Sequence, residues 1–135
     1  MTIFVNESSE SIDSGLSKMK AAMIEDYAGF MPPNDDIRKK MCAEFVDGFT
    51  ITYGKKYIKI HEKSGGVKAF VVGVDNDKKF KKGDILKPAG YAAPARNAAR
   101  GNVLDGGYPI NWTGPLSIRW IEKALNICIS NAYSR

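Results

Sequence analysis

The first part of the chain carries apolar residues at intervals of three and four positions. The stripe consists of Ile12, Leu16, Met19, Met23, Tyr27 and Phe30. Because this spacing places every member on one face of an α-helix, it predicts a helix that buries that face. Ser9 or Ser11 is suited to cap its amino-terminal end, and Pro32 and Pro33 end it.

A second helix is predicted between Asn34 and Gly48. Asn34 is a suitable cap, and Gly48 ends the helix. The acidic pair Asp35 and Asp36 falls in the first turn, where the helix dipole favours negative charge. The apolar positions of this helix are Ile37, Met41 and Phe45. A stripe that contains methionine is more typical of a core than of a ligand groove, so we expect these side chains to be buried.

From Phe49 the period of the apolar residues changes to two, which is the period of a β-strand. Alternation over 49–53 and 57–60 predicts two antiparallel strands joined by a turn at Gly54. A second, Gly-rich turn precedes an apolar run over 67–74, which predicts a central strand.

Two shorter elements are predicted next. A fourth strand over 84–87 is confined to a sheet edge, or ended, by Pro88. The Ala-rich segment 92–102 predicts a short helix, with Pro94 near its start and Gly101 just past its end.

The chain is expected to finish with one more helix. After a short stretch over 108–112, Gly114 and Pro115 open a helix over about 116–131. Its apolar residues cover more than one face. Such a helix is either wedged in the core or shared with a partner chain, so a homo-oligomer formed through it is one expectation.

Together these elements predict a single α+β domain over residues 1–135. Two helices occupy 1–48, and a small twisted antiparallel sheet or partly open barrel of about four to five short strands occupies 49–115. The carboxy-terminal helix occupies 116–135. With 135 residues, of which 44% are hydrophobic, the chain is long enough for one core and too short for two.

Positive charge is concentrated in the predicted β part. Residues 49–102 include ten Lys and two Arg against three Asp and one Glu, a net charge of +8. Residues 1–48 have a net charge of −4, and residues 103–135 have a net charge of +1. So uneven a division predicts an electropositive surface for a polyanion or an acidic partner.

The cysteines and the lack of apolar targeting segments indicate a cellular compartment. Cys42 and Cys128 lie far apart, and neither has a second Cys or a His at metal-ligand spacing. Two reduced thiols are therefore expected rather than a disulfide. Residues 1–10 lack the features of a signal peptide, and no apolar run of about 20 residues is present to span a membrane. We expect a soluble cytoplasmic protein.

Two arginines form the first candidate site. The site consists of Arg96, Arg100, Asn97 and Asn102. In the predicted short helix the two arginines share a face, and their guanidinium groups could clamp a phosphate or a carboxylate. The alternative is a structural pair that binds loop carbonyls, Asp84 or Asp105.

Lysines form the second candidate surface. They are Lys55, Lys56, Lys78, Lys79, Lys81 and Lys82. With Phe80 and Tyr91 as stacking aromatics, they resemble a contact with a nucleic-acid backbone. The alternative is a solvated loop that resists aggregation. Aromatic residues of a small β domain are mostly core, so further stacking residues are not expected among them.

No sequence motif in the chain indicates a particular catalytic reaction. His61 is the only histidine, and it is expected to be an ordinary sheet or surface residue. Residues 75–77 begin like a calcium loop, but Gly and Glu do not follow at the required offsets, so a turn is predicted. We expect no metal, no cofactor and no catalytic residue.

Four stretches resemble a family of small, uncharacterised tailed-bacteriophage proteins. They are residues 49–60, 80–88, 93–105 and 111–115, and the similarity spans roughly residues 38–116. The resemblance implies a phage origin and the cytoplasm of an infected bacterium, without implying a reaction or a ligand. Chains of that family tend to end soon after their Trp-Thr-Gly-Pro segment, so 117–135 is an extension.

Three functions fit these observations. The favoured one is a non-catalytic phage accessory protein that binds nucleic acid, or a host machine that handles nucleic acid, through its basic face. The second is an inhibitor that binds a host protein, such as a defence protein, stoichiometrically. The third is an enzyme on, or a binder of, a phosphate-bearing nucleotide, with Arg96 and Arg100 stabilising charge and His61 as acid or base.

Overall fold

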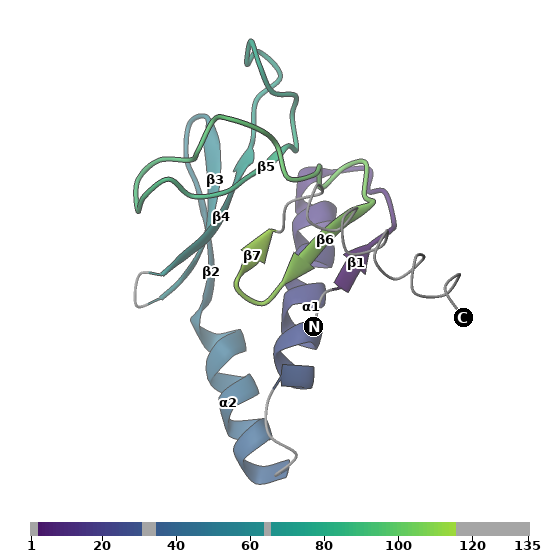
Figure 1. Ribbon diagram of the computed structural model, residues 1–135, viewed down its shortest axis with the longest axis vertical. Coiled ribbons are helices and arrows are strands. Elements are labelled where there is room, and N and C mark those ends of the chain that lie inside the picture. Colours follow the sequence, from purple (N-terminus) through teal and green to yellow (C-terminus); the bar gives the residue numbers. More distant parts are fainter. Residues whose placement is uncertain (1–2, 31–34, 64–65, 116–135) are drawn as a thin grey trace, which may run out of the picture.

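The computed structural model describes residues 3–30, 35–63 and 66–115, and it confirms an α+β fold (Figure 1). The elements follow in the order β1 (Ile3–Val5), α1 (Ile12–Phe30), α2 (Asp35–Gly48), β2 (Phe49–Tyr53), β3 (Tyr57–Glu62), β4 (Val67–Val72), β5 (Ile85–Leu86), β6 (Tyr108–Asn111) and β7 (Gly114–Pro115). The strands form two antiparallel sheets, neither of which closes into a barrel. The helix predicted over 116–135 lies outside the described residues.

The larger sheet has the strand order β2-β3-β4-β5. Ile51 of β2 lies opposite Ile60 of β3, so apolar side chains of neighbouring strands share a face. An extended segment, 100–103, continues the pairing beyond β5. Its Arg100 N–H donates to the Ile85 carbonyl over 2.7 Å. The strands predicted from the period of two are confirmed, with small differences at their ends.

The smaller sheet has the order β1-β6-β7, and sequence patterning did not predict it. Its strands have two to four residues, which is too short for a periodic signal. The sheet approaches the larger one at Gly114, whose φ is +138°. A Cβ atom at Gly114 would lie 2.5 Å from the Lys68 carbonyl oxygen of β4, so only glycine permits this approach.

The first predicted helix is confirmed as α1. Ser11 caps it, because the Ser14 N–H donates to the Ser11 hydroxyl over 3.1 Å. The buried members of the predicted stripe are Leu16, Met19 and Met23. Phe30, at the last position of α1, is instead 59% exposed. The stripe therefore faces the core over most of the helix and leaves the core at its carboxy-terminal end.

Each face of the larger sheet is apolar. The face that joins the main core with α1 carries Phe49, Ile58, Ile60, Ala69, Val71 and Ile85. The other face carries a smaller cluster of Phe70, Val72 and Leu86. Phe80 and Ala99, from the loops that follow β4 and β5, pack on this smaller cluster. The two loops thus cover a sheet face that would otherwise be open to water.

The second predicted helix is confirmed as α2, but its predicted buried stripe is wrong. Only Phe45 is buried, Met41 is half-buried, and Ile37 is 48% exposed. Figure 1 shows the reason, since α2 extends away from the sheets and meets them only at its carboxy-terminal end. A stripe at its amino-terminal end has no sheet to pack against.

The short helix predicted over 92–102 is also wrong. Here the chain forms a hairpin-like loop, closed by the Ala95 N–H donating to the Lys87 carbonyl over 2.7 Å, and Tyr91 lies near its tip. The chain then pairs with β5. Backbone donors find partners across the loop and along the sheet edge, which outweighs the modest helix preference of alanine.

Candidate functional site

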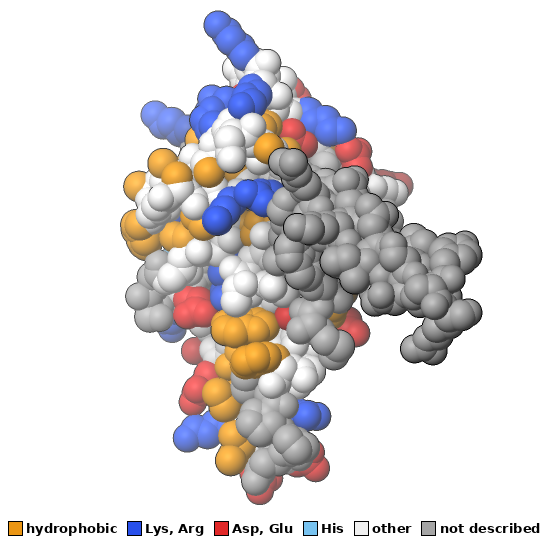
Figure 2. Space-filling model, in the orientation of Figure 1, with side chains coloured by type: hydrophobic (Ala, Val, Ile, Leu, Met, Phe, Trp, Pro, Cys, Tyr) orange, Lys and Arg blue, Asp and Glu red, His pale blue; other side chains and the backbone are white. Residues whose placement is uncertain are grey.

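Three segments meet at one end of the larger sheet, and we call this region the basic loop end. They are the β2–β3 turn at 54–56, the loop at 73–84 and the hairpin-like loop at 87–99. Figure 2 shows Lys and Arg side chains gathered over this end, at the top of the view. Most of the lysines and arginines that the sequence singled out lie on these three segments.

One buried carboxylate, that of Asp77, organises the basic loop end. Its side chain has no exposed surface, although the residue stands in a lysine-rich loop. Arg96 donates two hydrogen bonds to it, one to each oxygen, both over 3.0 Å. Lys56 forms an ion pair with it over 3.0 Å. The backbone N–H groups of Lys79 and Phe80 donate over 2.8 and 2.9 Å.

These contacts have an electrostatic consequence. Hydrogen bonds from Arg96, the two backbone N–H groups and Lys56 favour the ionised form, so the pKa of Asp77 is well below its usual range. A carboxylate therefore occupies the kind of site that the sequence assigned to a bound anion. Arg96 is committed to Asp77, rather than to Asp84 or Asp105 as the structural alternative had it.

Further contacts fix Arg96 and its neighbours. Arg96 also donates to the Tyr57 hydroxyl, and its guanidinium carbon lies 4.9 Å from the centre of the Phe80 ring. Lys79 donates to the carbonyls of Arg96 and Asn97 over 2.5 and 3.1 Å. Phe80 is only 5% exposed, so its ring offers no open face to a base.

Asn102 and Lys81 are also engaged within the molecule. Asn102 is 5% exposed, and its amide donates to the Asp84 carboxylate over 2.9 Å and to the Lys82 carbonyl over 3.0 Å. Its oxygen accepts from two backbone N–H groups of the following turn. Lys81 forms an ion pair with Asp105 over 2.5 Å. Both residues connect loops, and their partners Asp84 and Asp105 are the carboxylates that the structural alternative had assigned to the arginines.

Five further cations on or next to these loops form no side-chain hydrogen bond or ion pair with the described residues. They are Lys55, Lys78, Lys82, Lys87 and Arg100. Lys55 and Lys78 directly adjoin Lys56 and Asp77 of the buried cluster and are exposed. Lys82 lies apart, lining a shallow pocket with Glu10 and Asp13 near the start of α1. Arg100 is half-buried and does not join Arg96 on Asp77.

Tyr91 is the exposed aromatic residue of this end. It is 62% exposed, and the Lys59 ammonium lies 3.6 Å from the centre of its ring. Of the two predicted stacking residues, Tyr91 is thus open and Phe80 is not. Asn97 is exposed, and its carbonyl, rather than its side chain, holds Lys79.

Sequence reasoning missed a second charged centre, Lys68 of β4. Its side chain is 6% exposed, and its ammonium donates to the Trp112 carbonyl over 2.9 Å and pairs with Glu62 over 3.2 Å. The ammonium also lies 5.0 Å from the centre of the Phe45 ring and 5.5 Å from that of Trp112. A lysine inside the apolar run 67–74 was the signal that could have found it.

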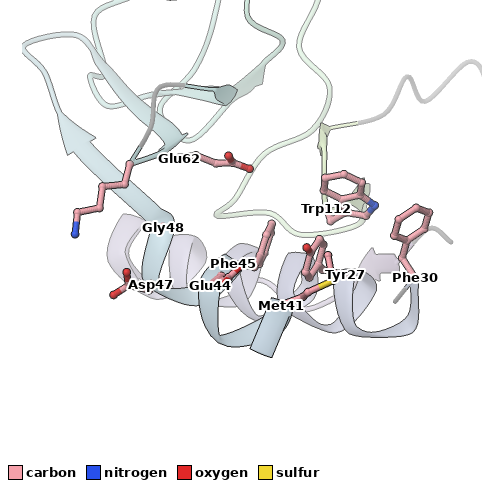
Figure 3. Close-up of a pocket in the computed structure, with 10 residues that line it drawn as sticks. Tyr27, Phe30, Met41, Glu44, Phe45, Asp47, Gly48, Glu62 and Trp112 are labelled. Carbon is pink, nitrogen blue, oxygen red and sulfur yellow. The ribbon is translucent and has the colours of Figure 1, made fainter. Parts of the chain in front are cut away.

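Phe45, Glu62 and Trp112, which contact the Lys68 ammonium, also line a pocket of about 640 Å³ where α1 and α2 meet the two sheets (Figure 3). The lining residues are Tyr27, Phe30, Met41, Glu44, Phe45, Asp47, Gly48, Glu62, Lys63 and Trp112. We call it the aromatic pocket. Met41, expected in the core, lines it instead.

The remaining candidates have ordinary surroundings. His61 shares a hydrogen bond with the Thr52 hydroxyl over 2.8 Å, as expected of a sheet histidine. Cys42 is a free, half-buried thiol, and Cys128 lies outside the described residues. Within 3–30, 35–63 and 66–115, no three His, Cys, Asp or Glu side chains come together to hold a metal ion. No helix in these ranges is long and apolar enough to cross a membrane.

Comparisons with known proteins add no relative to this description. No protein-family model, no curated protein and no solved structure matches the chain. The site must therefore be interpreted from its own chemistry.

Proposed function

We propose that the protein is a non-catalytic phage accessory protein that binds nucleic acid through the basic loop end. The target is nucleic acid itself or a host machine that carries it, in the cytoplasm of an infected bacterium. The observation that carries the proposal is the Asp77 cluster, which ties the β2–β3 turn, the 73–84 loop and the 87–99 loop together. The resemblance to phage proteins supplies the setting.

The cluster supports binding because it separates two tasks. Arg96 and Lys56 pair with Asp77 and hold the loops together. Lys55 and Lys78 lie beside them in the sequence, and their exposed ammonium groups remain available for a ligand. Lysines held on a fixed backbone contact phosphates at little further entropic cost, and each contact releases condensed counterions. Tyr91 adds an exposed ring for a base, with Lys59 against it as a cation.

The test measures binding of nuclease-treated protein to labelled single- and double-stranded DNA and RNA over a salt series. We expect micromolar affinity that falls steeply with salt. The double variant Lys55→Ala/Lys78→Ala should reduce the slope of log K against log salt on duplex DNA by about 1.8, or about 0.9 for each lost phosphate contact. The matched control, Lys39→Ala/Lys40→Ala, removes the same charge from the exposed surface of α2.

Two results would reject the proposal. One is failure to bind any strand at low salt. The other is an equal effect of the two double variants, which would show that binding depends on the net charge of the protein and not on the basic loop end. In the first case the second candidate, an inhibitor of a host protein, becomes the one to pursue. The exposed apolar residues of α1 and α2, which are Phe30, Ile37 and Val46, favour that candidate.

A further inference from the structure

The aromatic pocket lies at the opposite end of the larger sheet from the basic loop end, and aromatic rings form much of its wall. Tyr27 stacks on Phe45 with ring centres 4.3 Å apart, and it meets Trp112 edge-on at 5.3 Å. Phe30 continues the row, with its ring centre 5.4 Å from that of Trp112. Figure 3 shows these rings following one another along the pocket, with the Glu62 side chain reaching toward them from β3.

Acidic groups surround these rings. Glu44 and Asp47 line the pocket from α2, and Glu62 lines it from β3, against the single lining cation Lys63. The pKa of the Tyr27 hydroxyl is raised by burial and by the neighbouring Cys42, Glu44 and Glu62. With the Lys68 ammonium included, three carboxylates stand against two ammonium groups, so the surroundings of the rings keep a net charge of −1. The π faces and this excess negative charge both attract a cation.

The protein already holds one alkylammonium group in this way. The Lys68 ammonium lies against the Phe45 and Trp112 rings and pairs with Glu62, all of which also line the pocket. These groups therefore stabilise an alkylammonium ion from the protein side. Lys68 pairs with Glu62 and not with Glu44 or Asp47, which remain for an ion arriving from the solvent side.

We propose that the aromatic pocket binds an organic cation of the alkylammonium class. The ligand is either a small quaternary amine or the side chain of a lysine, free or methylated, presented by a peptide. Both sources offer the same chemistry, a positive group with polarised C–H or N–H bonds against ring faces. The site is independent of the proposed nucleic-acid interface.

Choline and its neutral isostere 3,3-dimethylbutan-1-ol test the assignment, because they share a shape and differ in charge. The reporter is the fluorescence of Trp112 in a Trp120→Phe background of the full chain, which leaves one indole. We expect roughly millimolar affinity for choline and at least about tenfold weaker binding of the alcohol. Equal binding of the two would show an apolar pocket only and would overturn the proposal.

A matched pair of double variants tests whether the carboxylates that line the pocket bind the cation. Glu44→Gln/Asp47→Asn should weaken choline binding about fivefold or more, because both carboxylates line the pocket. Glu10→Gln/Glu25→Gln removes two exposed carboxylates that do not line it and should leave binding unchanged. Thermal melting of each variant shows whether it is folded. An equal loss of choline affinity in both folded variants would also overturn the proposal.

A final arm separates the ligand sources. Short peptides with a central lysine, a trimethyllysine or a norleucine are titrated beside choline. Binding of the two charged peptides in preference to the norleucine peptide assigns a lysine-bearing partner, whereas choline binding alone assigns a small amine. If no cation binds and Trp112 is already shielded from iodide quenching, another part of the chain or a second copy covers the pocket, and the proposal fails.

Discussion

The basic loop end and the aromatic pocket are each built around one buried charge of the sign opposite to most of its neighbours. At the loop end, the Asp77 carboxylate is enclosed by Arg96, Lys56 and two backbone N–H groups. At the pocket, the Lys68 ammonium is enclosed by two rings, one carbonyl and Glu62. In both regions the buried charge holds together segments that are distant in the sequence.

The difference lies in how completely each charge is satisfied. Asp77 accepts from five donor groups, so the loops around it are fixed, and the neighbouring Lys55 and Lys78 face solvent. Lys68 has one carbonyl and one carboxylate that is itself 41% exposed, with rings supplying the rest of its surroundings. The five donors to Asp77 thus fix a surface, whereas the Lys68 centre leaves Glu62 partly in solvent beside a pocket whose further carboxylates, Glu44 and Asp47, favour a cation.

The largest expected effect comes from removing the Asp77 charge. Asp77→Asn keeps the shape of the side chain but places an amide against a guanidinium and an ammonium that have lost their counter-charge. We expect the melting temperature at pH 7 to fall by several degrees, measured by circular dichroism. Asp75→Asn is the control, since Asp75 is exposed in the same loop and pairs with no cation of the described residues. Similar melting of the two variants would contradict the central role of Asp77.

Acid should weaken the same centre. The folded pKa of Asp77 is lowered from its ordinary 3.8, so its contribution to stability is complete above that value and is lost as the pH falls through the range below it. The wild-type melting temperature should therefore fall more steeply between pH 4 and pH 2 than that of Asp77→Asn, which has no such proton to bind. Parallel curves would show that Asp77 is not responsible.

The sequence predicted what is local in this fold. The α1 stripe, a serine cap at Ser9 or Ser11, and the paired strands predicted over 49–53 and 57–60 depend on residues within a few positions of one another. Strand β1 pairs with β6 from the far end of the chain, and three residues carry no periodic signal of that partner. Long-range pairing therefore decided what local patterning could not.

The candidate site shows the same division. The turn at Asp77 follows from local polarity, whereas its bond with Arg96, 19 residues further on, depends on the loop closing over the sheet. Reading 92–102 as a helix placed Arg96 and Arg100 on one face, and the hairpin-like loop separates their roles. Lys68 was visible only as an anomaly in an apolar run.

At the pocket, removing either partner of the Lys68–Glu62 pair should have unequal effects. Glu62→Gln leaves a buried ammonium without a counter-charge and should cost about 2 kcal/mol of unfolding free energy. Lys68→Met replaces the ammonium with an apolar group of similar size and leaves Glu62 partly hydrated, so about 1 kcal/mol is expected. Urea unfolding measures both. A larger cost for Lys68→Met would mean that packing of the lysine stem, rather than charge pairing, dominates this centre.

The smallest effect distinguishes the two ends by their exposed rings. Tyr91→Ala removes the open ring beside Lys59 and should weaken single-stranded nucleic-acid binding about fivefold, which corresponds to about 1 kcal/mol. Phe30→Ala removes a ring of similar exposure from the pocket and should leave nucleic-acid binding unchanged while weakening choline binding. Fluorescence anisotropy and the Trp112 titration measure the two affinities. Because each variant serves as the control for the other, a loss of both affinities in either one would show that the two ends are coupled rather than independent.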